Sequence, residues 1–168
     1  MADRVDQLVQ LAREIASADP DFQVVKGPSD GDHKTAAYLR ELRRRAAEVF
    51  GIDCGEQKIC GSTNYAVDFY LEPEKTVVEV ALGLPNPSSE FEKDILKAII
   101  GKDYVPVERL VFISRAGGEK KCRQPGRTAL KVWALTKHSL RIDVFDLGGI
   151  PRKRRRKRER ASAQGRVV

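Results

Sequence analysis

Long apolar runs are absent from this 168-residue sequence. A membrane-spanning helix needs about 20 consecutive apolar residues, and no stretch of the chain approaches that length. Four acidic residues also interrupt the first twenty positions, which is not typical of a secretory signal peptide: Asp3, Asp6, Glu14 and Asp19. We therefore expect a cytoplasmic protein without a membrane segment. Because 41% of the residues are apolar, the chain can bury the core of one ordinary domain.

Cysteine and histidine are scarce. The chain has three cysteines, Cys54, Cys60 and Cys122, and no Cys-x-x-Cys pair. An odd number of cysteines without paired spacing favours free thiols in an intracellular protein. A zinc site formed by these thiols with His33 or His138 is the alternative, but the spacing matches no common zinc pattern.

Several enzyme motifs are missing as well. The sequence contains no Gly-x-Ser-x-Gly, no phosphate-binding P-loop and no Gly-x-Gly-x-x-Gly. Their absence argues against the corresponding serine hydrolases, nucleotide triphosphatases and dinucleotide-binding enzymes. The two histidines are isolated from any candidate nucleophile, so a histidine-activated nucleophile is not indicated.

Positive charge is concentrated at one end of the chain. Residues 151–168 contain nine Lys or Arg residues and one Glu, whereas residues 1–150 have a net charge of −1. A dense block of like charge repels itself, so we expect a disordered basic tail. Such a tail suits DNA backbone contact through counterion release, and a solubility or localisation role is the alternative.

Hydrophobic periodicity and turn residues divide the rest of the chain into nine elements. Helices are predicted at 3–18, 32–50, 89–101 and 126–138, with Ser89 and Glu92 forming a capping box at the third. Strands are predicted at 56–62, 65–71, 76–82, 109–114 and 140–147. This order predicts an α/β fold with three layers, in which helices flank a mixed sheet that begins with an antiparallel meander. We expect residues 1–31 to form an N-terminal helix and loop, residues 32–150 the main domain and residues 151–168 the tail.

Two acids lie within the apolar strands of the expected meander. If Pro73 and Glu74 form the turn, Leu71 pairs with Thr76, and Asp68 then faces Glu79. Their β carbons would be about 5 Å apart on one face of the sheet. Like charges so close need a shared proton or a bound divalent cation such as Mg²⁺. The alternatives are a salt bridge, for example to Lys58, or a register shifted so that one acid faces solvent.

This pattern resembles the PD-(D/E)xK nuclease superfamily, which includes many type II restriction endonucleases. The resemblance rests on Asp68, on Glu79 within Glu79-Val80-Ala81, on the helix that follows, and on the element order over residues 32–114 and on to 147. It implies a restriction-endonuclease-like core and Mg²⁺-dependent hydrolysis of DNA phosphodiester bonds, with Mn²⁺ as a substitute. Asp68, Glu79 and the carbonyl of Ala81 would bind the metal, and a homodimer is expected if both strands are cut.

The resemblance also identifies assisting residues and one departure. A glutamate from the helix before the meander often assists in this superfamily, and Glu41 is preferred here over Glu48. The pattern places Lys two residues after the second acid, where this chain has Ala81. Lys58 and Lys93 are the candidate substitutes. The alternative function is a catalytically inactive nucleic-acid-binding protein on the same fold.

A basic segment at residues 115–127 is the second candidate for DNA contact. It surrounds Gly117 and Gly118 with five cationic residues, Arg115, Lys120, Lys121, Arg123 and Arg127. We expect an exposed loop that contacts the DNA backbone, and an ordinary solvated loop is the alternative.

Overall fold

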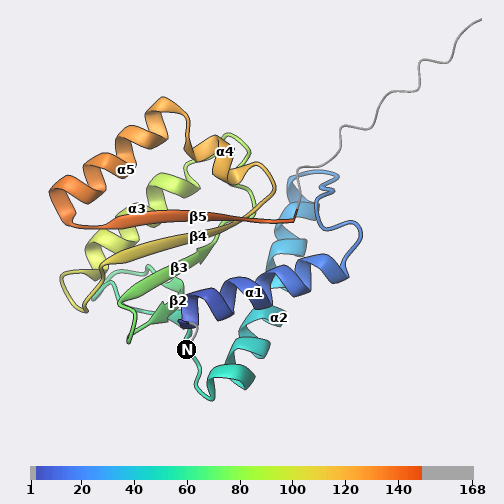
Figure 1. Cartoon of the computed structure of the whole chain (residues 1–168), viewed down its shortest axis with the longest axis horizontal. Coiled ribbons are helices and arrows are strands. Elements are labelled where there is room, and N and C mark those ends of the chain that lie inside the picture. Colours follow the sequence, from blue (N-terminus) through green and yellow to red (C-terminus); the bar gives the residue numbers. More distant parts are fainter. Residues whose placement is uncertain (1–2, 149–168) are drawn as a thin grey trace, which may run out of the picture.

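Five strands form one mixed sheet in the order β1-β2-β3-β4-β5, as shown in Figure 1. This computed structural model describes residues 3–148. β1, β2 and β3 pair antiparallel, whereas β4 runs parallel to both β3 and β5. The strands are β1 (Gly55–Gln57), β2 (Val67–Leu71), β3 (Thr76–Val80), β4 (Arg109–Arg115) and β5 (Arg141–Leu147). The expectation of an α/β fold with a mixed sheet and an antiparallel meander is confirmed.

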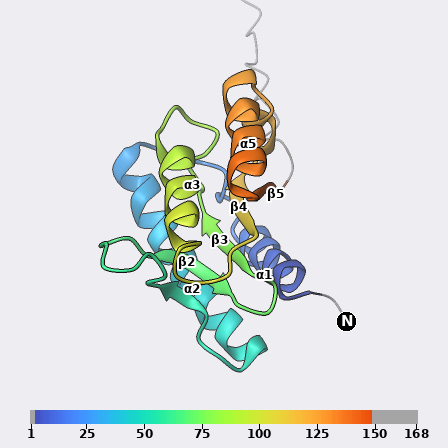
Figure 2. The ribbon, with the colours of Figure 1, turned by 90° about the vertical axis from the view of Figure 1, so that its left-hand side faces the viewer.

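Helices cover both faces of this sheet (Figures 1 and 2). The helices are α1 (Arg4–Ala18), α2 (Pro28–Phe50), α3 (Glu90–Gly101), α4 (Gly118–Cys122) and α5 (Pro125–His138). One apolar core joins α1 and α2 to one sheet face, and Leu8, Leu42 and Phe69 are fully buried there. A second core joins α3 and α5 to the other face, around Phe91, Phe112 and Ala134. Burial of both faces explains the apolar run at residues 110–113 in the middle of β4, which agrees with the buried strand that the sequence predicts.

The two N-terminal helices begin and end at residues that favour those positions. Asp3 caps α1 by accepting a hydrogen bond from the backbone of Val5. α2 starts at Pro28, four residues before the predicted start, because Pro is well suited to the first helical turn. Gly51 ends α2 with a φ of 68°, which a glycine adopts without steric cost.

The register of the meander agrees with the prediction. Leu71 pairs with Thr76, and Phe69 pairs with Val78, so Asp68 and Glu79 occupy opposite positions on neighbouring strands. The first strand of the meander is shorter than predicted, since β1 covers only residues 55–57 rather than 56–62. The predicted strands 65–71 and 76–82 are also shorter in the structure, where β2 begins at Val67 and β3 ends at Val80.

Two local predictions are wrong. Ser89 occupies the position before α3, but its side chain makes no capping hydrogen bond, so the predicted capping box is not formed. The segment 115–127 is not an exposed loop, because it contains α4 and buries two of its five cationic side chains. Arg115 ends the buried strand β4, and Arg127 donates a hydrogen bond to the carbonyl of Leu84. Only Lys120, Lys121 and Arg123 of this set remain at the surface.

Three further expectations concern thiols, membrane segments and the tail. All three cysteines are free and buried. Within residues 3–148, no helix combines the length and apolar character needed to cross a membrane. The predicted basic tail, residues 151–168, lies outside the described residues.

Candidate functional site

Asp68 and Glu79 lie side by side on the face of the sheet that α3 covers. The Oδ2 atom of Asp68 accepts a hydrogen bond from the backbone of Val80 at 2.8 Å. The Oε2 atom of Glu79 accepts one from the backbone of Asp68 at 3.4 Å. Each carboxylate is therefore bonded to the neighbouring strand, so the strand pairing itself fixes their relative position.

Lys97 reaches this pair of acids from α3. Its Nζ atom lies 2.8 Å from Glu79 Oε1 and 2.8 Å from Asp94 Oδ1, and donates a further hydrogen bond to the carbonyl of Ala66 at 3.1 Å. All three charged side chains are buried, with exposed fractions of 3% for Glu79, 5% for Asp94 and 8% for Lys97. The structure thus places a lysine from the following helix, α3, beside the second acid.

Sequence reasoning did not identify Lys97 or Asp94. The sequence feature that could have revealed them is their spacing. Asp94 and Lys97 are three residues apart, so they lie on one face of α3. That face is also the one that buries Phe91 and Ile95 against the sheet. Charged residues within a buried helical face must be paired, and Glu79 on the adjoining strand is the partner.

A cavity of about 550 Å³ lies in front of these side chains. It is bounded by the first half of α2, the end of β3 and the start of α3. Among its lining residues are both predicted acids and the predicted lysine Lys93, which is exposed. The remaining charged residues of the lining are Asp32, Glu90, Asp94 and Lys97. The cavity therefore brings together three predicted site residues, Asp68, Glu79 and Lys93. Three further carboxylates and one further ammonium, which the sequence did not identify as site residues, also line it.

The electrostatics of the cavity reflect burial of these charges. Burial raises the pKa of Glu79 well above its usual value, the carboxylates of Asp94 and Asp68 raise it further, and Lys97 opposes the rise. Burial would lower the pKa of Lys97, but Glu79 and Asp94 outweigh that effect and raise it. Burial and the same two aspartates raise the pKa of Glu90 to about 7. Among these neighbours, the ammonium of Lys97 is therefore the group that lowers the pKa of Glu79, against the effects of burial and of the two aspartates.

Arg43 from α2 holds the other acid. Its guanidinium lies 3.3 Å from Asp68 Oδ1 and 3.2 Å from Glu56 Oε2, so it bridges β2 and the short strand β1. Asp68 thus has a cation on one side and the open cavity on the other, with an exposed side-chain fraction of 22%.

The other predicted residues lie elsewhere. Glu41 forms salt bridges with Arg44 and Arg45, and hydrogen bonds from these two residues lower its pKa to about 2. It lines a separate cavity rather than the one that contains Asp68 and Glu79. Glu48 is paired with Arg44 at the surface, and Lys58 is exposed after β1.

Ala81 follows β3 and is fully buried in the core beneath α3. Its carbonyl, which the resemblance assigns to the metal, accepts a hydrogen bond from the backbone of Leu84 at 3.1 Å. Ala81 does not line the cavity in front of the acids. The structure thus places the predicted carbonyl ligand within a turn of the chain.

Asp68 and Glu79 offer a divalent cation only part of a ligand shell. Among residues 3–148, no group of three or more His, Cys, Asp or Glu side chains is arranged to hold a metal ion. Mg²⁺ commonly binds through one or two carboxylates, with water and substrate phosphate completing its octahedron. Asp68 and Glu79 are adjacent and line an open cavity, so they are the two carboxylates that such an incomplete protein shell would use, although each of their oxygens also contacts a protein donor.

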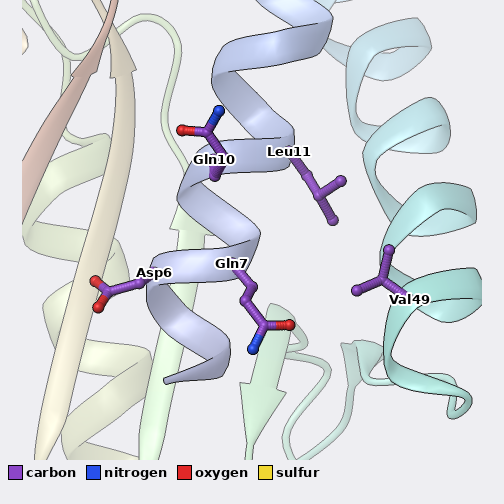
Figure 3. Close-up of a pocket in the computed structure, with 5 residues that line it drawn as sticks. All are labelled: Asp6, Gln7, Gln10, Leu11 and Val49. Atoms are coloured by element: carbon purple, nitrogen blue, oxygen red, sulfur yellow. The ribbon is translucent and has the colours of Figure 1, made fainter. Parts of the chain in front are cut away.

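A second, smaller cavity has a different character. It has a volume of about 310 Å³ and lies between α1 and α2 (Figure 3). Leu11 and Val49 provide its apolar wall, and Asp6 is the one carboxylate of its lining, alongside Gln7 and Gln10. A single carboxylate among apolar and amide side chains offers no acid–base or metal-binding group comparable to the first cavity.

Comparisons of the chain with models of protein families, with curated proteins and with solved structures returned no match.

Proposed function

We propose that the protein is a metal-dependent endodeoxyribonuclease that hydrolyses DNA phosphodiester bonds. The observation that carries the proposal is the convergence of Asp68, Glu79 and Lys97 at one open cavity. Two strand carboxylates beside a buried ammonium are the groups that the PD-(D/E)xK pattern employs. Ala81 stands where the pattern has a lysine, and we infer that Lys97 takes the place of that lysine because its ammonium contacts Glu79.

Each residue then has a defined task. Asp68 and Glu79 would hold a divalent cation, Mg²⁺ or Mn²⁺. When bound, this cation supplies polarisation of the phosphate and activation of water. Lys97 opposes the rise in the pKa of Glu79 and places a positive charge beside the carboxylates, where it would stabilise negative charge that develops on the phosphate. Asp94 fixes the direction of the Lys97 side chain, and Arg43 fixes Asp68.

The proposal extends to assembly and location. Cutting both strands requires two sites, which a two-fold homodimer would supply. Buried free thiols suit the reducing environment of the cytoplasm.

Cleavage of supercoiled plasmid DNA tests the proposal. Wild-type protein is incubated with Mg²⁺ or Mn²⁺ beside the Asp68→Asn and Lys97→Met variants. We expect metal-dependent nicking by the wild type and a loss of at least about a hundredfold in each variant. Glu92→Gln is the matched control, since Glu92 is exposed on α3 and does not line the cavity. It should cleave at the wild-type rate.

A second candidate function is nucleic-acid binding without cleavage. The observation that favours it is Ala81, whose position holds no lysine and whose carbonyl is already bonded to Leu84. Absence of nicking by folded wild-type protein, together with retained binding of DNA in a mobility-shift assay, would reject the nuclease and support this alternative. Nicking that persists in Asp68→Asn would reject the assigned site.

A further inference from the structure

Arg115 is a buried arginine whose charge is only partly satisfied. It ends β4, and its exposed fraction is 7%. Its Nε atom donates a hydrogen bond to the carbonyl of Phe22 at 2.9 Å, and its guanidinium carbon lies 5.3 Å from the centre of the Phe22 ring. Its Nη2 atom is buried, yet within residues 3–148 no acceptor lies within hydrogen-bonding distance of it.

An unpaired guanidinium nitrogen inside a protein is energetically costly. Arginine does not escape this cost by losing its proton, because its pKa lies far above neutrality. Burial lowers the pKa of Arg115, and the carboxylates of Asp30 and Asp19 only partly oppose that effect. Neither aspartate forms an ion pair with it in the described part of the chain. The Nη2 atom is therefore a buried donor without an acceptor among the described residues, and an anion from outside the chain would supply that acceptor.

Arg115 lines a cavity of about 780 Å³ at the carboxyl ends of β3 and β4, and it also lines the smaller cavity that contains Glu41. Ligands of α/β proteins commonly bind at this edge of a sheet. Much of the lining consists of residues with small side chains, including Gly27, Gly31, Gly83 and Ser88, which leaves room for a ligand.

This cavity adjoins the one that contains the strand carboxylates. The two share four lining residues: Asp32, Thr35, Ser88 and Glu90. Together they form one cleft between the start of α2 and the segment that links β3 to α3. Asp68 and Glu79 lie at one end of this cleft, and Arg115 lies at the other.

We propose that Arg115 binds a backbone phosphate of the nucleic-acid strand, next to the phosphate held at Asp68 and Glu79. The proposal rests on the proposed function, because it uses the same cleft and the same class of substrate. The planar guanidinium forms paired hydrogen bonds to phosphate oxygens. Its bond to Phe22 and its stacking on the Phe22 ring fix its plane before the strand arrives.

A two-phosphate probe tests this assignment without knowledge of a recognition sequence. Binding of thymidine 3′,5′-bisphosphate, thymidine 5′-monophosphate and inorganic phosphate to the full chain is measured by calorimetry, with Ca²⁺ in place of Mg²⁺. In the wild type, the second phosphate should raise affinity by about tenfold. Arg115→Gln should abolish this increase. Arg40→Gln is the matched control, because Arg40 is exposed on α2 and lines neither cavity; it should retain the increase.

Three results would overturn the proposal. An increase that persists in Arg115→Gln would show that another group binds the second phosphate. Inorganic phosphate that binds as tightly as the bisphosphate would assign the site to free phosphate rather than to a strand. If Arg115→Gln unfolds, Arg115→Lys decides: it keeps the charge but not the paired donors, so an unreduced increase would also refute the assignment.

The result of the phosphate-binding experiment can be distinguished from the result of the cleavage assay. Plasmid nicking without an Arg115-dependent increase would reject the phosphate site and retain the nuclease. An Arg115-dependent increase in a protein that nicks no DNA would retain the phosphate site and reject the nuclease.

Discussion

Nζ of Lys97 on α3 lies 2.8 Å from Oε1 of Glu79 on β3, and both side chains are almost completely buried. A buried ion pair of this kind is costly to break, because the remaining partner is left charged and unsolvated. The pair also connects the helix to the strand that carries the second acid. Its disruption should therefore affect both stability and the chemistry of the cavity.

Lys97→Met should destabilise the protein by about 3 kcal/mol at pH 8. Without the ammonium, the pKa of Glu79 rises further, because burial and the nearby Asp94 and Asp68 carboxylates are no longer opposed. A carboxyl whose pKa is raised on folding stabilises the fold at low pH and loses that contribution as pH rises. The loss should thus be smaller at pH 5 than at pH 8, as measured by urea unfolding.

The double variant Glu79→Gln/Lys97→Met provides the control for this prediction. With both charges removed, the penalty should be clearly smaller than the sum of the two single changes. Lys137→Met, at the exposed end of α5, should leave stability unchanged within about 0.5 kcal/mol. Strict additivity of the two single changes would contradict a coupled pair.

Glu90→Gln should stabilise the metal-free protein at pH 8 but not at pH 5. The pKa of Glu90 is raised from 4.5 to about 7, so its contribution to stability is complete below pH 4.5 and lost as pH rises through 7. Glutamine removes this pH-dependent loss. After allowance for solvent screening, we expect a rise in the unfolding midpoint of about 3 °C at pH 8, measured by thermal melting with a chelator present. Glu92→Gln should change neither midpoint, and an equal rise at both pH values would contradict the prediction.

Gly118→Ala and Gly126→Ala should have opposite effects on stability. A β carbon at Gly118 would lie 2.5 Å from the β carbon of Ser114, which is fully buried and cannot move aside. We expect a loss of about 2 kcal/mol or more. A β carbon at Gly126 meets nothing within 4 Å, and alanine favours the helix, so we expect a gain of about 0.5 kcal/mol. Chemical denaturation of both variants measures the difference, and a neutral Gly118→Ala would contradict it.

The parts of the site that depend on local pattern could be predicted from the sequence. Alternation along the strands and the turn at Pro73 determine a register that pairs Leu71 with Thr76, and this places Asp68 opposite Glu79. The same reasoning could not place Lys97. A charged residue in a helix is normally solvated, and only the tertiary contact with Glu79 makes its burial favourable.

Arg115 and Arg127 were mispredicted for the same physical reason. In the sequence they belong to a glycine-containing basic stretch, which is typical of a solvated loop. In the structure, Arg127 is buried because it bonds to the Leu84 carbonyl, and Arg115 because it stacks on Phe22. Phe22 is 93 residues away in the sequence from Arg115, so no local pattern could reveal the contact.

The hydrogen bonds that tie Asp68 and Glu79 to each other's strands have a consequence for how such a site can change. A slip of either strand by one residue would turn its acid toward the opposite core, so the two carboxylates are inseparable from the pairing of the sheet. The ammonium is under no such constraint, because it arrives on a separate helix. Any segment that crosses this face within reach of a lysine side chain could supply it. The positions of the two acids are thus fixed by the strand pairing, whereas the lysine can be supplied from different segments of the chain.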